Sequence, residues 1–512
     1  MTSDSFRHRS SPSVPENSPE GSVQFFKIEY IDFSGGIEPM TQSFDIVILG
    51  GGTAGYVAAV RAAQLGKTVA VVEKDKLGGT CLHRGCIPSK ALLRSAEIYA
   101  SLRDGERFGI EVSGMRFNLG KAMERKQAVV NQLHRGVEYL MKKHDIAVFR
   151  GTGRLIGPSI FSPRSGSVSV EQEDGEIVTL VPEHLIIATG SRPRTLGGIE
   201  PDGERILTSD HALQMKELPA SIVIVGGGVI GVEWASMLND FGVDVTIVEY
   251  ADRLIPTEDE DISRELEKSL KRRGVNIWTG AAVQTDTLEI SEAGVSFQAV
   301  RGEEAVSFTA EKLLVSVGRQ ANIEGFGLEN TDVKVENGLI KVNEFMQTAE
   351  SHIYAVGDCI GGLQLAHAAS HEGIVAVEHI CGQRDHWYAP HLVPRCIYTR
   401  TEVASVGLTE REARDKGYDV KIGKVPFQAI GKALVHGSGE GFAKVIADRR
   451  SGDIVGVHMI GAHVTELISE AALAQLLNAV PWEVGRTIHP HPSLSEIVGE
   501  AMLAVDGLAI GI

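Results

Sequence analysis

The fold is decided by the stretch Phe44-Asp45-Ile46-Val47-Ile48-Leu49-Gly50-Gly51-Gly52-Thr53-Ala54-Gly55. Its apolar first half is typical of a buried parallel strand, and its second half forms a glycine-rich turn. An alanine-rich helix is expected to follow and to end near Leu65, and a second strand is expected over residues 68–72, directly before Glu73. Strand, glycine turn, helix, strand and acid in this order predict a dinucleotide-binding βαβ unit.

Each marker residue of this unit has a physical task. Gly50 makes the tight turn, Gly52 lets the backbone approach a pyrophosphate, and Gly55 lets the helix pack closely on the strand. The carboxylate of Glu73 is expected to accept a hydrogen bond from a ribose hydroxyl. A glycine triplet alone is a weak signal, but here the strand, the helix and the acid accompany it.

The same unit recurs further along the chain. A strand is expected over residues 221–225, then glycines at Gly226, Gly228 and Gly231, a helix to Phe241, a strand over 244–248, and Glu249. The spacing from Gly55 to Glu73 and from Gly231 to Glu249 is eighteen residues in both copies. The chain is therefore predicted to bind two dinucleotides.

Glu249 bears on which nucleotide the second unit binds. A carboxylate there would accept a hydrogen bond from a ribose 2′-hydroxyl and repel a 2′-phosphate, which favours NAD over NADP. Arg253, four residues later, weakens that preference. A βαβ unit that has lost its ligand is the alternative.

A second informative stretch runs from Gly78 to Lys90 and holds Cys81 and Cys86, five residues apart. Five residues of regular helix rise about 7.5 Å, more than the roughly 4.4–6.8 Å between the Cα atoms of a disulfide. The segment must therefore bend, and Gly85 permits the bend. A helix is expected over residues 88–100, and its N-terminal amides would favour a thiolate at Cys86. The sequence predicts a thiol–disulfide exchange centre, with a pair of buried free cysteines as the alternative.

The composition of the chain limits the classes of function that it can have. The 512 residues exceed one hydrophobic core, and a net charge of −17 argues against nucleic acid or an anionic membrane as partner. Five cysteines do not make a secreted disulfide framework, so a reducing, cytoplasmic location is expected. No run of eighteen apolar residues is present, so no membrane span is expected, and no metal site is expected either.

The first 39 residues are rich in Ser and Pro and show no helical or strand periodicity, so this extension is expected to be disordered. Its acidic residues argue against an organelle transit peptide. Met40 directly precedes the first strand, and we hypothesise that the native chain starts there. Peptides from residues 1–39 in a mass spectrum of the native protein would refute this.

Seven separated motifs together resemble one family. They are the two glycine fingerprints, the Cys81–Cys86 segment, Ala188-Thr189-Gly190-Ser191-Arg192-Pro193, Val317-Gly318-Arg319, Ala355-Val356-Gly357-Asp358, and His489-Pro490-His491-Pro492-Ser493-Leu494-Ser495-Glu496. From residue 43 onward the chain resembles the dihydrolipoamide dehydrogenases, within the FAD-dependent pyridine nucleotide-disulfide oxidoreductases.

The resemblance implies an α/β fold with two Rossmann-like dinucleotide-binding domains, for FAD and NAD, and a C-terminal α+β dimerisation domain. After the 1–39 extension, it implies a first FAD part over 40–189, an NAD domain over 190–315, an FAD/central part over 316–389 and an interface domain over 390–512. Strand-like runs at 402–406 and 443–446 and a helical stretch at 464–479 agree with it.

The resemblance also implies roles for individual residues. Lys90 and Glu233 would form an ion pair beside the flavin, although each would otherwise be read as a solvated charge. Asp358 would bind the flavin ribitol, although an aspartate there could equally serve a turn. The implied FAD residues are Gly50, Gly52, Gly55, Glu73, Gly79, Thr80, Lys90, Thr189, Gly190, Ser191, Asp358 and Ala366. The implied NAD residues are Gly226, Gly228, Gly231, Glu249 and Gly318.

A base is needed because an alkyl dithiol, with thiol pKa values of about 8.5, is mostly protonated at neutral pH. By resemblance, His491 is that base and Glu496 orients its imidazole, whereas His489 is a packing neighbour. The implied reaction passes electrons from dihydrolipoamide to the Cys81–Cys86 disulfide, then to FAD and to NAD⁺. Because the family's base comes from the other subunit, a homodimer is implied, with a lipoyl-bearing E2 or H-protein as partner.

One departure from the usual family sequence stands inside the redox segment. His83-Arg84 occupies the place where Asn-Val is frequent, which puts a cation beside the disulfide. Arg84 could lower a thiol pKa, meet a partner domain or simply be exposed.

The alternatives to this function are a glutathione-type reductase, which would usually carry basic residues in place of Glu249, or a subunit that mainly binds within a multienzyme assembly. A mercuric reductase would need a C-terminal cysteine pair, which is absent, and a transhydrogenase would lack the redox pair.

Overall fold

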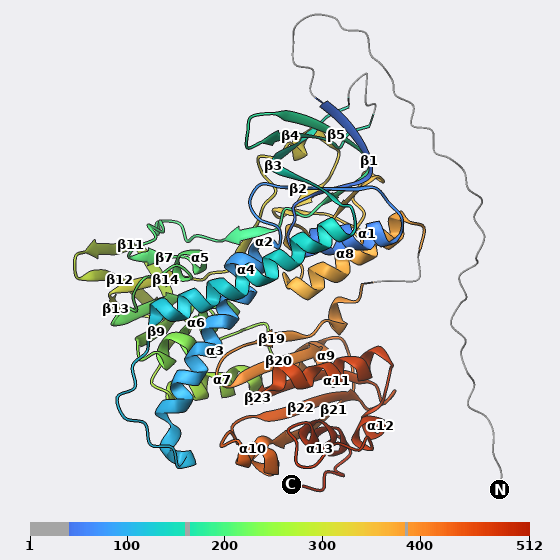
Figure 1. Cartoon of the computed structure of the whole chain (residues 1–512). Helices are drawn as coiled ribbons and strands as arrows, with labels where there is room; N and C mark the ends of the chain where they lie inside the picture. Colours follow the sequence, from blue (N-terminus) through green and yellow to red (C-terminus); the bar gives the residue numbers. More distant parts are fainter. Residues whose placement is uncertain (1–39, 159–163, 384–387, 512) are drawn as a thin grey trace, which may run out of the picture. The chain divides into compact units, whose positions relative to one another are not determined.

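The first dinucleotide unit contributes two neighbouring inner strands to a mixed, mainly parallel sheet (Figure 1). The computed structural model describes residues 40–158, 164–383 and 388–511. The extension 1–39 lies outside the described residues, so its disorder and the start at Met40 stay predictions. Residues 40–512 make one compact unit.

Strand β1 (Met40–Leu49), helix α1 (Thr53–Gln64) and strand β2 (Val69–Glu73) match the predicted order. The strand predicted to begin at Phe44 begins at Met40, because its first residues pair in parallel with β5 (Ile177–Ile187). That pairing joins segments far apart in the sequence, so a local apolar pattern could not reveal it.

The parallel strands of this sheet follow the order β3 (Ala147–Ile156), β2, β1, β5 and β18 (Ile353–Ala355). Strand β4 (Ser167–Gln172) joins β3 and β5 in antiparallel pairing. Helix α1 packs against α8 (Ala366–Ile380), and Figure 1 shows the two helices side by side, with α4 (Leu119–Lys143) crossing nearby.

The second unit repeats this plan. Its parallel sheet has the order β10 (Asn276–Trp278), β9 (Asp244–Val248), β8 (Ser221–Val225), β14 (Lys312–Val315) and β7 (Ile206–Leu207). Helix α6 (Val229–Asp240) follows its glycine turn. The predicted bounds of β8, α6 and β9 hold within one residue. The unit also carries α5 (Ser209–Ala212), α7 (Glu260–Arg272) and the antiparallel strands β11 (Ala282–Ser291), β12 (Gly294–Arg301) and β13 (Glu304–Ala310).

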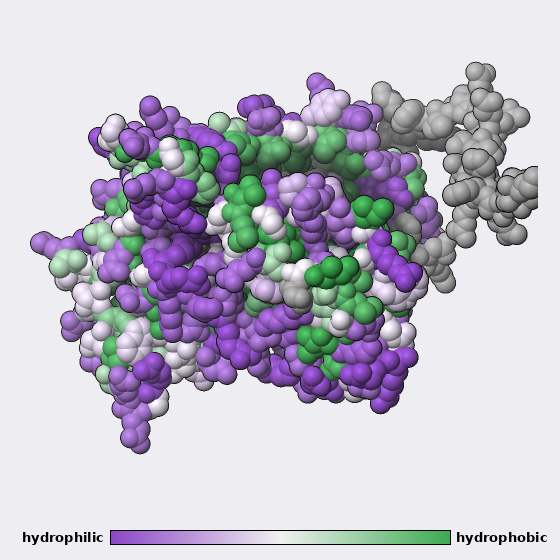
Figure 2. Space-filling model, turned by 90° about the horizontal axis from the view of Figure 1, so that it is seen from below, coloured by the Kyte–Doolittle hydropathy of each residue, from purple (hydrophilic) through white to green (hydrophobic). Residues whose placement is uncertain are grey.

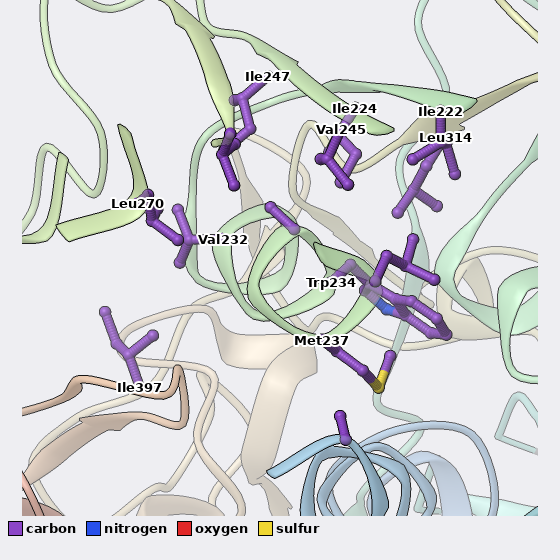
Figure 3. Close-up of a cluster of buried hydrophobic side chains, with 14 of the residues drawn as sticks. Ile222, Ile224, Val232, Trp234, Met237, Val245, Ile247, Leu270, Leu314 and Ile397 are labelled. Carbon is purple, nitrogen blue, oxygen red and sulfur yellow. The ribbon is translucent and has the colours of Figure 1, made fainter. Parts of the chain in front are cut away.

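Helix α6 lies in the middle of a hydrophobic core and is buried on nearly all sides. Figure 3 shows Val232, Trp234 and Met237 of α6 among apolar side chains of the surrounding strands and of α7. Ile397, from the C-terminal part of the chain, belongs to the same cluster. The α6 backbone is thus fixed by packing, and a charged residue on this helix, Glu233, is buried as a consequence.

Two short strands connect the nucleotide units. Strand β6 (Ser191–Pro193) leaves the first sheet, β15 (Arg319–Ala321) returns to it, and the two pair in antiparallel fashion. Thr189 Oγ1 donates to the carbonyl of Asn322 at 2.6 Å, and Asn322 Nδ2 donates to the carbonyl of Thr189 at 3.0 Å. These reciprocal bonds hold the crossover together.

The C-terminal part is an antiparallel sheet flanked by helices. Its order is β19 (Arg395–Ile397), β20 (Glu402–Gly407), β23 (Ile454–Gly461), β22 (Phe442–Asp448) and β21 (Val420–Pro426). The helices are α9 (Glu410–Asp415), α10 (Gly431–Val435), α11 (Val464–Leu476), α12 (Pro481–Gly485) and α13 (Glu496–Ala504). The helix predicted to reach Ala479 ends three residues earlier, where Asn478 takes a positive φ of 52°.

The remaining elements are the two helices of the redox segment and several short strands and turns. These two are α2 (Gly79–Arg84) and α3 (Cys86–Arg103). The others are β16 (Val335–Glu336), β17 (Leu339–Ile340) and the 3₁₀ turns η1 (Gly105–Phe108), η2 (Leu328–Asn330), η3 (Gly357–Ile360), η4 (Pro390–Leu392) and η5 (Phe427–Ala429). The predicted α/β fold with two Rossmann-like domains and a C-terminal α+β domain is confirmed. Among the described helices, none combines the length and the apolar character that a bilayer crossing requires.

Candidate active site

The redox segment consists of two helices that meet at Gly85. Cys81 lies in α2, Cys86 is the first residue of α3, and the two form a disulfide with a Cα–Cα distance of 4.7 Å. The bend predicted at Gly85 is therefore present. The helix predicted to begin at Pro88 begins two residues earlier, which puts the Cys86 sulfur at the helix N-terminus, where the backbone amides favour a thiolate.

The first glycine turn has the geometry that a dinucleotide needs. A side chain at Gly50 would approach the carbonyl oxygen of Ala188 to 2.2 Å, and one at Gly55 would approach the carbonyl oxygen of Gly50 to 1.9 Å. Gly52 instead faces open space, with only the Cα of Gly79 within 4 Å, at 3.9 Å. Two of the glycines thus serve packing, and the third leaves room for a ligand.

Glu73 and Glu249 occupy equivalent positions in the two units. Glu73 Oε2 accepts a hydrogen bond from the Gly51 amide at 2.8 Å, and Glu249 Oε2 accepts one from the Gly227 amide at 2.5 Å. Burial raises the pKa of Glu73, and the Gly51 amide opposes that rise. Each carboxylate is therefore held by its own glycine turn, next to the space that a nucleotide would enter.

A cavity of about 560 Å³ joins the glycine turn to the disulfide. Its size lies within the usual range of ligand pockets, roughly 300–1,000 Å³. The predicted residues that line it are Gly52, Thr80, Cys81, Cys86, Lys90, Gly190, Ser191, Glu233, Asp358 and Ala366. Val229 and Ile230, at the start of α6, border the same cavity. The open face of Gly52 and the disulfide in the same wall fit the predicted FAD.

Other predicted cofactor residues do not line the cavity. Gly50 and Gly55 pack the turn, Gly79 packs against Gly52, and the Thr189 hydroxyl is bound to Asn322. In the second unit, Gly226 and Gly231 pack closely against backbone, whereas Gly228 has nothing within 4 Å. Gly318 has a φ of 106° and its carbonyl accepts from the Arg194 amide at 3.0 Å.

Lys90 and Glu233 lie together in the cavity wall. Lys90 Nζ is 2.8 Å from Glu233 Oε2, and the Glu233 side chain is 8% exposed. Tyr398, which sequence reasoning did not single out, donates its backbone amide to Glu233 Oε1 at 3.0 Å and places its ring 4.6 Å from Lys90 Nζ. Burial raises the pKa of Tyr398 to about 12, so its phenol stays neutral. The C-terminal part of the chain thus helps to hold this ion pair.

Asp358 contacts two side chains of the crossover, Ser191 and Arg319. The Ser191 hydroxyl donates a short hydrogen bond to Asp358, and Arg319 Nε lies 3.7 Å from Asp358 Oδ2. Arg319 Nε also donates to the Ser191 hydroxyl at 2.7 Å. The motif around Gly318 was recognised from the sequence, but the role of Arg319 was not, because it depends on the crossover that brings β15 beside β6.

Arg253 does not contradict the predicted nucleotide preference. Its guanidinium donates to the carbonyl of Pro256 at 2.7 Å and lies 3.3 Å from Glu260, and the side chain is 17% exposed. This arginine is engaged within its own loop, which leaves Glu249 as the charged group fixed on the glycine turn.

His491 and Glu496 form a pair at the C-terminal end of the chain. The distance from His491 Nδ1 to Glu496 Oε1 is 2.9 Å, and the His491 side chain is 78% exposed. The hydrogen bond with His491 and that from the Ser493 amide lower the pKa of Glu496. His489 differs, because it is 10% exposed and binds Glu470 at 2.8 Å. Neither His491 nor Glu496 lines the cavity of its own chain.

The domain that carries this pair exposes large apolar side chains. Figure 2, seen from below the view of Figure 1, shows hydrophobic patches among polar surface. The exposed apolar residues of this domain include Leu434, Val435, Leu476, Leu477, Trp482 and Ile488. Exposed apolar area of this kind is typical of a surface that another protein covers.

Two family models match the chain. Residues 44–373 match the model described as pyridine nucleotide-disulphide oxidoreductase, and residues 393–502 match the dimerisation domain of the same family. The chain belongs to this family. The resemblance inferred from the motifs is thereby confirmed, and the second match supports a homodimer.

Curated relatives cover nearly the whole chain. It is 63% identical to a dihydrolipoyl dehydrogenase of Bacillus subtilis, over 92% of this chain and 100% of that protein. It is 42% identical to a dihydrolipoyl dehydrogenase of Zymomonas mobilis, with the same coverage of both chains.

Solved structures of the family share the fold. LpdA of Mycobacterium tuberculosis matches with a TM-score of 0.82 and 28% identity, over 90% of this chain and 99% of that chain. The HOCl-induced flavoprotein disulfide reductase RclA of Escherichia coli, solved as a Cu(II) complex, matches with a TM-score of 0.77 and 28% identity, also over 90% of this chain and 99% of that chain.

Proposed function

We propose that this chain is a dihydrolipoyl dehydrogenase, which oxidises dihydrolipoamide to lipoamide and reduces NAD⁺. The observation that carries the proposal is one cavity whose wall contains both the open glycine turn and the Cys81–Cys86 disulfide. The 63% identity to a protein of that name supports the same activity. FAD bound there would supply the two-electron chemistry that links the reduced cysteines to NAD⁺.

The cysteines perform the exchange with the substrate. A thiolate of dihydrolipoamide attacks Sγ of Cys81, forming a mixed disulfide while Cys86 leaves as a thiolate. The second substrate thiol, after losing its proton, attacks the substrate sulfur of that mixed disulfide, releases lipoamide and leaves Cys81 reduced. The N-terminal amides of α3 stabilise the charge on Cys86.

The base for this exchange is His491 of a second copy of the chain. His491 takes the proton of the attacking thiol, and Glu496 holds the imidazole at 2.9 Å so that the other ring nitrogen faces outward. The high exposure of His491 and its absence from the cavity of its own chain support an arrangement in which a partner copy receives it.

The electron acceptor is NAD⁺ bound on the second glycine turn. Glu249 is held by the amides of Gly227 and Ala251, at 2.5 and 2.6 Å, and would accept from the adenosine ribose. Lys90 and Glu233 bridge the nucleotide units, since Lys90 belongs to α3 and Glu233 to α6. Their ion pair lines the same cavity as the disulfide and would contact the flavin.

The substrate dithiol is expected to be protein-bound. A lipoyl-bearing E2 of a 2-oxoacid dehydrogenase complex, or an H-protein of a glycine-cleavage system, would present it in the cytoplasm. The binding-subunit alternative is compatible with this role, because docking would add to catalysis.

The test compares two reactions of the purified protein. NAD⁺-dependent oxidation of dihydrolipoamide is expected, whereas NADPH-dependent reduction of glutathione disulfide is not. Activity in the second reaction alone would overturn both the substrate and the role of Glu249.

A further inference from the structure

The cavity wall contains one cation whose counter-ion lies outside the cavity. The charged side chains that line it are Lys90 with Glu233, Arg319 with Asp358, and Arg84. The first two cations face carboxylates that line the same cavity, at 2.8 and 3.7 Å. Arg84 pairs with Asp75, which does not line the cavity.

His83, the neighbour of Arg84, has a different task. Its Nε2 lies 2.9 Å from the Leu77 carbonyl, which His134 Nδ1 approaches to 3.0 Å. Burial lowers the pKa of His83, and the nearby His134 adds to that effect. His83 is therefore a neutral anchor that fixes α2 to the loop after β2, and Arg84 is the residue of α2 that carries a permanent charge.

Asp75 is fixed by the nucleotide-binding loop. Its amide donates to Glu73 Oε1 at 2.8 Å, while Glu73 Oε2 binds the Gly51 amide. The Asp75 side chain is 45% exposed and that of Arg84 is 47% exposed, so water weakens their attraction. The arginine keeps a positive potential toward the cavity that Asp75 only partly cancels.

We propose that Arg84 stabilises the thiolate that reduction of the disulfide leaves at Cys86, and that Asp75 limits this effect. The inference rests on the redox role given to Cys81 and Cys86 in the proposed function. Arg84 lies two residues before Cys86, on the last turn of α2, and lines the same cavity as both cysteines. A cation there favours the reduced, ionised centre over the disulfide.

The reaction that reports on this balance is reduction by dithiothreitol. The reagent gives up two electrons and two protons and becomes a cyclic disulfide, while the Cys81–Cys86 sulfur bond breaks. Cys81 takes one proton as a thiol, and Cys86 remains a thiolate while the second proton goes to solvent. Stabilising the thiolate therefore raises the equilibrium fraction of reduced protein.

The experiment measures this fraction in two variants of the holoenzyme, Arg84→Gln and Asp75→Asn. Each is equilibrated in mixtures of reduced and oxidised dithiothreitol at pH 8, quenched with acid, alkylated and analysed by mass spectrometry. Arg84→Gln is expected to lower the reduction equilibrium constant by roughly two- to fivefold, and Asp75→Asn to raise it by a similar factor. Arg301→Gln, from a pair with Glu304 in which the arginine is 46% exposed, is the matched control.

Both substitutions break the same ion pair, so loss of the pair itself would shift the equilibrium in the same direction in both variants. Shifts in opposite directions therefore show that the charge of each side chain is responsible. Shifts in the same direction, or no shift in either variant, would overturn the proposal. Both effects are expected to shrink in 1 M salt, which screens the charges of Arg84 and Asp75. The dithiothreitol experiment does not use lipoamide. If the shifts occur in a protein that fails to oxidise dihydrolipoamide, the proposed function is refuted and the role of Arg84 is not.

Discussion

The Cys81–Cys86 disulfide and the His491–Glu496 pair differ in their surroundings. Cys81 and Cys86 lie in the wall of the cavity, which is also lined by Glu233, whose side chain is 8% exposed. His491 is 78% exposed and touches Glu496 through one ring nitrogen only. The cysteines lie inside a cavity of the chain, and His491 lies on its surface. This difference supports the proposal that one chain carries two halves of different active sites.

The largest effect is expected when the disulfide in the cavity is removed. Cys86→Ser removes the sulfur that must leave, so oxidation of dihydrolipoamide should fall by about 10⁴-fold or more in a steady-state assay with NAD⁺. Cys381→Ser is the control, since this free cysteine lies at the end of α8 and does not line the cavity. Retained turnover in Cys86→Ser would remove the disulfide from the mechanism.

The exposed half is broken by His491→Gln. Loss of a general base should lower turnover by about 10²- to 10⁴-fold, while the disulfide remains reducible by dithiothreitol. His489→Gln is the matched control, because His489 is 10% exposed and bound to Glu470. An equal loss in both variants would assign the effect to folding of the C-terminal domain.

The NAD site is a third region to compare, because all of its predicted residues lie in one chain. Glu249→Ala removes a charged acceptor and should raise the KM for NAD⁺ by about tenfold. The reduction equilibrium of the disulfide should not change. Glu303→Ala, at an exposed turn, provides the control. An unchanged KM in Glu249→Ala would contradict the ribose contact.

The smallest effect concerns the pH dependence of the exposed pair. The hydrogen bonds from His491 and the Ser493 amide lower the pKa of Glu496, so the carboxylate stays ionised until the pH falls below its ordinary range. Glu496→Gln weakens a charge-assisted hydrogen bond and should lower turnover by about fivefold. The loss is expected to be equal at pH 6 and pH 8. A loss that disappears at pH 6 would mean that Glu496 is already protonated there.

Much of the fold and of the candidate site could be predicted from short stretches of sequence. The glycine turns, their flanking strands and the acids Glu73 and Glu249 were predictable because each depends on residues within one βαβ unit. The bend at Gly85 was predictable from the spacing of two cysteines alone.

Other features depend on contacts between distant segments and were therefore missed. Tyr398 reaches Glu233 only because β19 shares a core with α6, and Arg319 reaches Ser191 only because β15 pairs with β6. The early start of β1 depends on β5 in the same way. The local pattern also hid α2, which begins after a Gly78 with a φ of 101°.

The central claim is that the base and the disulfide of one active site come from different chains. The direct measurement is the activity of a mixed dimer of Cys86→Ser and His491→Gln chains, co-expressed with different tags and purified on both. Each parent homodimer is expected to be nearly inactive, whereas the mixed dimer contains one intact site in two and should regain about half of the wild-type turnover. A mixed dimer as inactive as its parents would show that His491 acts within its own chain and contradict the account.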